Sequence, residues 1–264
     1  MAKLHALHDA GTVLDEPLVR RIGPADLRQA LAAGIDDFKA MPTHAFFIVL
    51  IYPVLGLVLA RIILGSDVLP LLFPLMSGFA LVGPFAAIGL YELSRRRERG
   101  QAFSLAHALR MLRSPAIGSI AALGALMLAV FVVWITTAQL LYQATFGSHV
   151  PATVGGFLQE VFATGRGWAL ILAGNLLGLV FSAVALSLSV VSFPMLIDRD
   201  VSAATAVRTS IRAVAANPAT MALWGLTVAG ALALGFLTLF LGLAVVLPVL
   251  GHATWHLYRR VVAS

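Results

Sequence analysis

Long apolar runs are the feature that most constrains what this chain can fold into. A helix needs about 20 apolar residues to cross about 30 Å of hydrocarbon. Four runs meet that requirement, and a fifth, Ala219–Tyr258, has 40 residues, or roughly 60 Å as a helix. We interpret the fifth run as two helices with a tight turn near Gly235–Gly242, which gives six predicted spans. The other four spans are Phe46–Leu64, Leu69–Leu93, Ile117–Tyr142 and Trp168–Ile197.

The composition supports a membrane protein and excludes a water-soluble enzyme. The chain is 60% hydrophobic and only 11% charged, whereas a soluble domain is about 25% charged. It has no cysteine, which excludes disulfides and thiolate metal sites. Residues 1–22 form a polar N-terminal tail without the apolar core of a signal peptide. We expect the rest, residues 23–264, to be a single six-helix transmembrane domain.

Basic residues orient the predicted spans. Positive residues are retained on the cytoplasmic side of a membrane. With the N-terminus inside, 16 of the 18 Lys and Arg residues fall on inner segments, and only Arg61 and Arg166 fall outside. We therefore predict that both termini are cytoplasmic and that the number of spans is even.

Three inner segments have the pattern of short amphipathic helices that end at a proline. In the first, from Gly23 to Pro42, the shared apolar face is Leu27, Leu31, Ile35 and Phe38. The second extends from Ser104 to Pro115. In the third, from Ser202 to Pro218, the shared face is Val207, Ile211 and Val214. We predict three repeats of a cytoplasmic amphipathic helix plus a helical hairpin, in approximate units 23–93, 103–197 and 202–258, with three unrelated interfacial helices as the alternative.

Four stretches of the chain resemble the bacterial integral membrane proteins called domain of unknown function 2189. They are Ala33–Phe38, Gly83–Glu98, Ser192–Arg199 and Gly251–Arg259. The resemblance extends from about Val19 to Val261 and implies a bacterial inner-membrane location. It implies no activity, although some members of the family carry the label of cytochrome c oxidase subunit I.

The histidines argue against an oxidase core. Such a core needs several histidines inside the membrane, and none of the seven here lies in the middle of a predicted span. His252 and His256 are one turn apart on one helix face, which makes them candidate ligands for haem or copper; interfacial packing is the alternative. We expect no cofactor, with haem or copper at this pair as a second possibility.

The inner ends of the spans carry charges. Glu92 has Arg95 and Arg96 three and four residues later, a spacing that favours ion pairs, and the basic run beside the membrane is suited to anionic lipid. Asp198 and Arg199 are interpreted as an ion-paired turn that caps the third amphipathic helix. The predicted inner-face ion pairs and lipid contacts involve Glu92, Arg95, Arg96, Arg97, Arg99, Asp198 and Arg199.

One polar residue lies in the middle of the fourth predicted span. Asn175 is flanked by Gly174 and Gly178, small residues that let another helix approach closely. We interpret the group as a helix-packing site, in which the amide bonds across the contact; a solute-binding site is the alternative.

No enzyme is predicted, because the chain has no phosphate loop, nucleophile elbow or zincin motif. The leading hypothesis is a non-catalytic accessory, assembly or scaffold component that contacts lipid or another membrane complex, such as a respiratory complex. The alternatives are a small-solute channel or transporter, and a haem or metal protein that uses His252 and His256. A nucleic-acid partner is excluded, because the chain has no large soluble basic surface.

Overall fold

The computed structural model describes residues 17–41, 70–71, 74–75, 87–102, 116–148, 153–238 and 241–263, and most of these residues are helical. The helices are α2 (Pro24–Ala40), α5 (Ile88–Glu98), α7 (Ile117–Phe146), α8 (Val154–Ala163), α9 (Gly165–Ser189), α10 (Ser192–Asp198), α11 (Ala203–Ala216), α12 (Pro218–Leu237) and α13 (Leu243–Val261).

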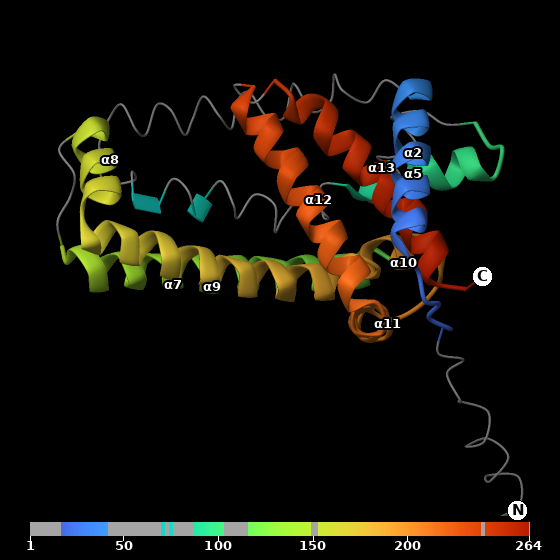
Figure 1. Ribbon diagram of the computed structural model, residues 1–264. Coiled ribbons are helices and arrows are strands. Elements are labelled where there is room, and N and C mark those ends of the chain that lie inside the picture. The colour runs from blue at the N-terminus through green and yellow to red at the C-terminus, as the bar shows by residue number, and fades with distance from the viewer. Residues whose placement is uncertain are drawn as a thin grey trace, which may run out of the picture.

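Two long helices, α7 and α9, lie side by side and set the long axis of the molecule (Figure 1). The short helix α8 lies at one end of this pair, and α10 and α11 lie at the other. The hairpin of α12 and α13 leads away from α11 and back, and α13 packs against both α2 and α5. One end of the molecule therefore gathers α2, α5, α10 and the last turns of α13.

Three helical segments in the described part of the chain are long and apolar enough to cross a membrane: Ile117–Phe146, Gly165–Asp198 and Pro218–Leu237. Only 22%, 33% and 22% of their most apolar windows are buried inside the protein, so most of their apolar side chains need lipid as their surroundings. The structure thus gives three candidate spans where the sequence predicts six. Phe46–Leu64 and most of Leu69–Leu93 lie outside the described residues.

The sixth predicted span corresponds to α13, which is not apolar enough to count as a candidate span. The last apolar run does divide into two helices, α12 and α13, with the turn where it was predicted, between Leu237 and Leu243. However, only the first half of α13 is apolar, and its second half carries His252, His256 and two arginines. By composition alone α13 is therefore not among the candidate spans.

Local sequence signals explain where the helices begin. The carboxylate of Asp26 accepts a hydrogen bond from the Gly23 backbone N–H at 2.9 Å and so closes the start of α2. The hydroxyl of Ser202 accepts from the Thr205 N–H at 3.2 Å at the start of α11. Both beginnings agree with the prediction. Helix α8 lies between the third and fourth predicted spans, where the sequence predicts no helix.

The fourth predicted span is interrupted near its end. Helix α9 ends at Ser189, and α10 begins at Ser192, two residues before Pro194. Proline has no N–H to continue the helical ladder. Pro194 therefore cannot bond to the Val190 carbonyl. Next to it, the Val191 N–H leaves the ladder of α9 and donates to the Ser210 hydroxyl of α11 at 3.2 Å. The break thus joins the end of the long helix to the amphipathic helix that follows it.

The buried faces of the two described amphipathic helices are shifted from the predicted apolar faces: Leu27 of the predicted α2 face is buried, and Leu31, Val207 and Val214 pack at the edge of the core. Helix α2 buries Leu27, Ala30, Gly34 and Asp37, and Ile35 of the predicted apolar face is 40% exposed. Helix α11 buries Thr205, Ala206, Thr209, Ser210 and Ala213, and Ile211 is 44% exposed. Small residues form the protein contacts because they allow the closest approach between helices.

The repeat itself is not shown. The predicted second amphipathic helix, Ser104–Pro115, lies outside the described residues, and α8 has no counterpart in the α12–α13 hairpin. The three-unit repeat, and with it the approximate boundaries of the units, therefore stays a prediction.

The two ends of the described chain are paired. Val19 and Val262 form an isolated antiparallel bridge, in which the Arg20 N–H donates to the Val261 carbonyl at 2.7 Å and the Ala263 N–H donates to the Leu18 carbonyl at 2.9 Å. The side chain of Asn217 accepts from the Ile22 N–H at 2.8 Å and fixes the same segment against the start of α12.

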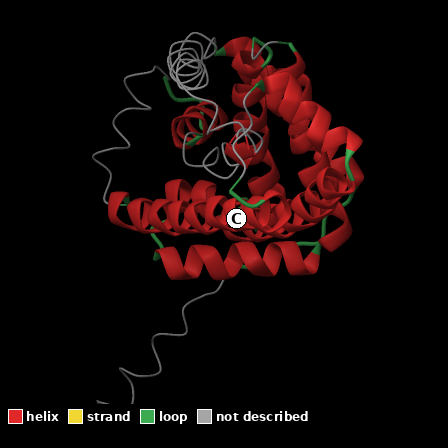
Figure 2. Cartoon of the chain, turned by 90° about the vertical axis from the view of Figure 1, so that its left-hand side faces the viewer, coloured by secondary structure: helices red, strands yellow, loops and turns green. Residues whose placement is uncertain are grey.

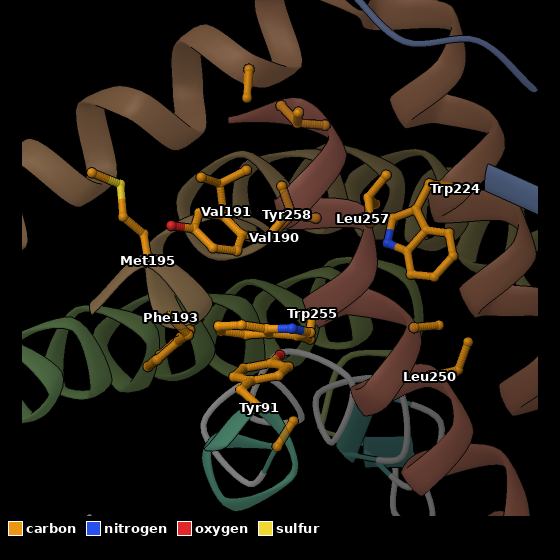
Figure 3. Packing of buried hydrophobic residues seen from close by; sticks show 14 of the residues in the cluster. Tyr91, Val190, Val191, Phe193, Met195, Trp224, Leu250, Trp255, Leu257 and Tyr258 are labelled. Carbon is orange, nitrogen blue, oxygen red and sulfur yellow. The ribbon is translucent and has the colours of Figure 1, made fainter. Parts of the chain in front are cut away.

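The largest aromatic side chains pack at this gathered end (Figure 3). Trp255 of α13 lies between Tyr91 of α5 and Phe193 of α10, and all three are at most 1% exposed. The hydrophobic core therefore joins three of the four motif stretches, and it holds the polar groups described next in fixed positions.

Candidate functional site

A buried carboxylate on α2 is the centre of the candidate site. Asp37 is 2% exposed, because it lies one turn after Gly34 on the face that contacts α13. A Cβ atom built on Gly34 would lie 2.6 Å from the backbone nitrogen of Ala253. The missing side chain at Gly34 thus lets α2 approach α13 closely enough to bring Asp37 to the histidines.

Three side chains donate hydrogen bonds to Asp37. Ser94 of α5 donates from its hydroxyl to Oδ2 at 2.5 Å, and His256 of α13 approaches the same oxygen through Nε2 at 2.9 Å. Arg97 of α5 pairs with Oδ1. We call these residues, together with His252, the Asp37 cluster.

The hydrogen bonds determine the protonation state of the Asp37 carboxyl group. Burial alone would raise the pKa of Asp37, but the hydrogen bonds from His256, Ser94 and Arg97 outweigh it and hold that pKa below its ordinary value. Asp37 is therefore a charged group inside the protein. Its charge is balanced by Arg97.

The fixed proton of Ser94 also defines the orientation of His252. Because the Ser94 hydroxyl donates to Asp37, its oxygen accepts from Nδ1 of His252, 2.7 Å away. Nδ1 then carries a proton, and the other ring nitrogen, Nε2, is buried without a hydrogen-bond partner in the described part of the chain. The ring is 0% exposed.

The arrangement differs from that of a nucleophilic serine. A nucleophile needs an exposed hydroxyl whose proton goes to a base, whereas Ser94 is 0% exposed and gives its proton to a carboxylate. Among the described residues, no group of three or more His, Cys, Asp and Glu side chains is placed to hold a metal ion. His256, one of the two residues proposed as ligands, approaches Asp37 through its Nε2 atom.

A second polar group, the Asp198 cluster, extends the site along α13. Asp198 at the end of α10 accepts from the Tyr258 hydroxyl at 2.9 Å and pairs with Arg99 at 3.0 Å and Arg259 at 3.3 Å. Glu98 accepts from the indole N–H of Trp255 and from Arg259, both at 3.0 Å.

The predicted inner-face charges lie in these clusters or next to them. Glu92 lies 2.6 Å from Arg95 and 2.7 Å from Arg96, the two arginines that the spacing assigns to it. Asp198 does not pair with Arg199 to cap α11. Arg199 donates to the Ala263 carbonyl instead, and Ser202 is the cap. Each arginine of the run 95–99 thus faces a carboxylate of the protein.

The other predicted site lies far along α9 and is not joined to the clusters. A Cβ atom on Gly174 would lie 3.6 Å from Leu141, and one on Gly178 would lie 3.4 Å from Trp134. The two glycines therefore face α7. Asn175 lies on the exposed side of α9 and donates to the Ile171 carbonyl of its own helix at 2.8 Å, so its amide does not bond across the contact between α7 and α9.

Sequence reasoning identified His252 and His256 but missed Asp37 and Ser94 as their partners, and it missed Glu98 as the partner of Trp255 and Arg259. Asp37 and Ser94 are separated by 57 positions and His252 by 158 more, so no local spacing relates them. One signal was present, because all of these residues lie in the four stretches that carry the family resemblance.

Comparison with known families bears on the middle of the chain. A family model described as a predicted integral membrane protein (DUF2189) matches residues 71–198. No curated protein and no solved structure matches. The family match includes Ser94, Arg97 and Asp198, and α2 and α13 lie outside it.

The match confirms the resemblance seen in the motifs. It also agrees with the three candidate spans, two of which fall inside it. Over residues 71–198 the chain is thus similar to the integral membrane proteins of domain of unknown function 2189.

Proposed function

We propose that this protein is a non-catalytic, multi-pass protein of the bacterial inner membrane that serves as an accessory, assembly or scaffold component of another membrane complex. The observation that carries the proposal is the way the Asp37 cluster ties three helices together. Both oxygens of the Asp37 carboxylate and the Ser94 hydroxyl are bonded to side chains of α5 and α13. A buried polar network of this kind fixes α2, α5 and α13 against one another, and its carboxylate and hydroxyl are occupied by protein groups rather than open to a substrate.

The paired chain ends support an even number of membrane crossings. Residues 18–20 bond to residues 261–263, which supports placing both ends on one side of the membrane. The described residues hold three candidate spans, an odd number, so this placement needs a further crossing. We assign α13 to it, because Arg259 near its end pairs with Glu98 and Asp198, beside the end of α10.

The length of α13 suits this role. Its 19 residues extend over about 28 Å, close to the thickness of the hydrocarbon layer. With α7, α9–α10 and α12 this makes four crossings, and the two predicted hairpin helices Phe46–Leu64 and Leu69–Leu93 would complete six. The excess of basic residues at the gathered end favours the cytoplasmic side for both termini.

Exposed apolar surface supports a role in assembly. Leu172, Leu176 and Leu179 of α9 are 67%, 65% and 65% exposed, and Leu226 and Leu234 of α12 are 68% and 66% exposed. Lipid or a partner's helices would cover these two faces, which point away from the protein core.

Co-purification tests the proposal. The full chain, expressed in its native host and extracted in a mild detergent, should retain a stoichiometric protein partner identifiable by mass spectrometry. We expect one of two substitutions, Leu176→Trp on α9 and Leu226→Trp on α12, to abolish partner binding and the other to leave it unchanged. Both substitutions keep the helix apolar, so the variant that retains the partner is the matched control. Recovery of the chain alone, at every detergent concentration that keeps it folded, would contradict an accessory role.

The alternatives make different demands on named residues. A channel or transporter that uses Asn175 requires loss of solute flux in Asn175→Leu. A haem protein that uses His252 requires an absorbance band near 400 nm in the purified chain that disappears in His252→Ala; its support is the unpartnered Nε2 atom.

A further inference from the structure

Asn175 carries the amide of α9, and it lies close to the middle of that helix, which extends from Gly165 to Ser189. One of its N–H groups donates to the Ile171 carbonyl at 2.8 Å. An amide offers two N–H donors and one carbonyl acceptor. The second N–H and the carbonyl oxygen of Asn175 have no partner among the described residues, and the side chain is exposed. If α9 crosses the membrane, these groups face hydrocarbon, where no water satisfies them.

The exposed side chains on either side of Asn175 repeat with a period of seven residues. Leu172 and Leu179 are 67% and 65% exposed, and Ser182, seven residues after Asn175, is exposed as well. The steps between these four residues alternate between three and four, which places them on one narrow strip of the helix. Two membrane helices commonly pack through such strips as a left-handed pair. We call Leu172, Asn175, Leu179 and Ser182 the α9 seam.

The α9 seam is turned away from the helix that packs along α9. Gly174 and Gly178 face α7, and at about 100° per residue the seam lies roughly a quarter of a turn from them. Val180 and Val184 line an apolar groove between α7 and α9, a quarter of a turn in the other sense. The seam and the groove are therefore on opposite sides of the α7–α9 pair.

The chain covers one end of this strip itself. Leu186, the next position of the strip, meets α12, because a Cβ atom built on Gly225 would lie 3.6 Å from it. Beyond that point α12 leads away from α9 (Figure 1) and leaves the seam exposed. Figure 2 shows helices and loops and no strand in the described part of the chain, so a helix face is the surface that this part offers to another chain.

We propose that the α9 seam is a homodimer contact, in which α9 pairs with α9 of a second copy of this chain about a twofold axis along the membrane normal. Such an axis brings every seam residue to its own counterpart. An amide is self-complementary, because it is both donor and acceptor, so the two Asn175 side chains satisfy each other. A single polar residue in a strip of this kind also fixes the register of the pair.

The composition of the seam favours a second copy over a different protein. Leucine, amide and hydroxyl groups carry no charge that would select a partner of opposite charge. The proposal rests on the membrane placement of α9 in the proposed function, but not on a partner of another sequence. With the seam occupied by a second copy, that partner would bind the exposed face of α12, so each association can be lost without the other.

Cysteine cross-linking in native membranes tests the contact. The chain has no native cysteine, so a covalent dimer of twice the chain mass joins two copies through the introduced residue. A disulfide requires Cα atoms within about 7 Å. We expect Leu172→Cys and Leu179→Cys to give this dimer on oxidation. Val180→Cys and Val184→Cys are the matched controls, because both positions are exposed but lie on the groove side, and they should stay monomeric.

Energy transfer between donor- and acceptor-labelled full chains in phosphatidylethanolamine vesicles measures the strength of the association. Asn175→Leu should lower the association constant by about five- to thirty-fold, the range found for hydrogen bonds between membrane helices in model peptides. Asn175→Gln keeps an amide and should retain most of the association. Thr227→Val removes a hydroxyl of α12 that bonds to its own helix and should change nothing.

Three outcomes would overturn the proposal. The first is no covalent dimer at Leu172 or Leu179, as expected if lipid or another helix of the same chain covers the seam. The second is cross-linking at Val180 and Val184 to the same extent or more. The third is an unchanged association constant in Asn175→Leu. The cysteine variants keep Asn175, so they test the contact even if Asn175→Leu does not fold. A dimer without any other co-purifying protein would contradict the accessory role alone.

Discussion

Replacing Asp37 with Asn is the sharpest test of the polar site. The substitution keeps the shape of the side chain but removes the charge that pairs with Arg97 and accepts from Ser94 and His256. Breaking a buried ion pair from one side costs about 3–5 kcal/mol. Arg97 is 38% exposed and can turn toward water, which reduces the cost to about 2–3 kcal/mol.

The assay is thermal unfolding of the purified full chain in one detergent. A loss of about 2–3 kcal/mol corresponds to a fall of about 4–12 °C in melting temperature for a chain of this size. Asp36→Asn is the matched control, because the neighbouring Asp36 is exposed and its substitution should change stability by less than about 0.5 kcal/mol. Equal melting temperatures for Asp37→Asn and Asp36→Asn would refute the reasoning.

Three further predictions follow from the same geometry. The pKa of Asp37 is held below its ordinary value of 3.8, so its contribution to stability is complete above pH 3.8 and is lost as the pH falls through the lowered pKa. The melting temperatures of wild type and Asp37→Asn should therefore converge on acidification. A constant difference between them would argue against a charged Asp37. Gly34→Ala should destabilise the protein strongly, because the new Cβ would lie 2.6 Å from the Ala253 backbone. The control, Gly118→Ala on α7, places a Cβ with nothing within 4 Å and should be neutral or stabilising. Similar thermal stabilities of the two variants would show that α2 does not pack on α13 at Gly34. Val19→Cys/Val262→Cys should form an intramolecular disulfide on oxidation in membranes, seen as a mobility shift, because a bridge of this hydrogen-bond pattern brings the Cα atoms to about 4.5 Å; Val19→Cys/Thr153→Cys should not, and cross-linking of both pairs alike would contradict the pairing of the chain ends.

The sequence was sufficient for features that depend on local patterns. The length of the apolar runs predicts α7 and the division of the last run into α12 and α13, and the residues Gly23, Pro24 and Ser202 predict where α2 and α11 begin. These features require only hydrophobicity and capping groups of neighbouring residues.

The faces of α2 and α11 could not be predicted in this way. The amphipathic pattern identifies an apolar strip but does not say whether protein or lipid covers it. The contact of Gly34 with Ala253 decides the matter for α2, and the contact of Ser210 with Val191 decides it for α11. Each is a long-range packing choice made by small residues.

The polar clusters were hidden for a related reason. The sequence suggests lipid as the partner of Arg97 and Arg99, because basic residues beside a span ordinarily face headgroups. In the structure the chain supplies Asp37 and Asp198 to them from α2 and α10. The pairing depends on how the helix ends converge, which spacing along the chain does not specify.

The central claim is that the helix ends bearing the Asp37 and Asp198 clusters, and with them both chain ends, converge on the cytoplasmic side. The chain has no native cysteine, so single cysteines at Leu18, Ala263 and Thr153 can be labelled in intact cells with a membrane-impermeant maleimide. The account predicts labelling at Thr153, beside α8, and none at Leu18 or Ala263 until the cells are opened. Labelling of Ala263 from outside, with Leu18 protected, would contradict it.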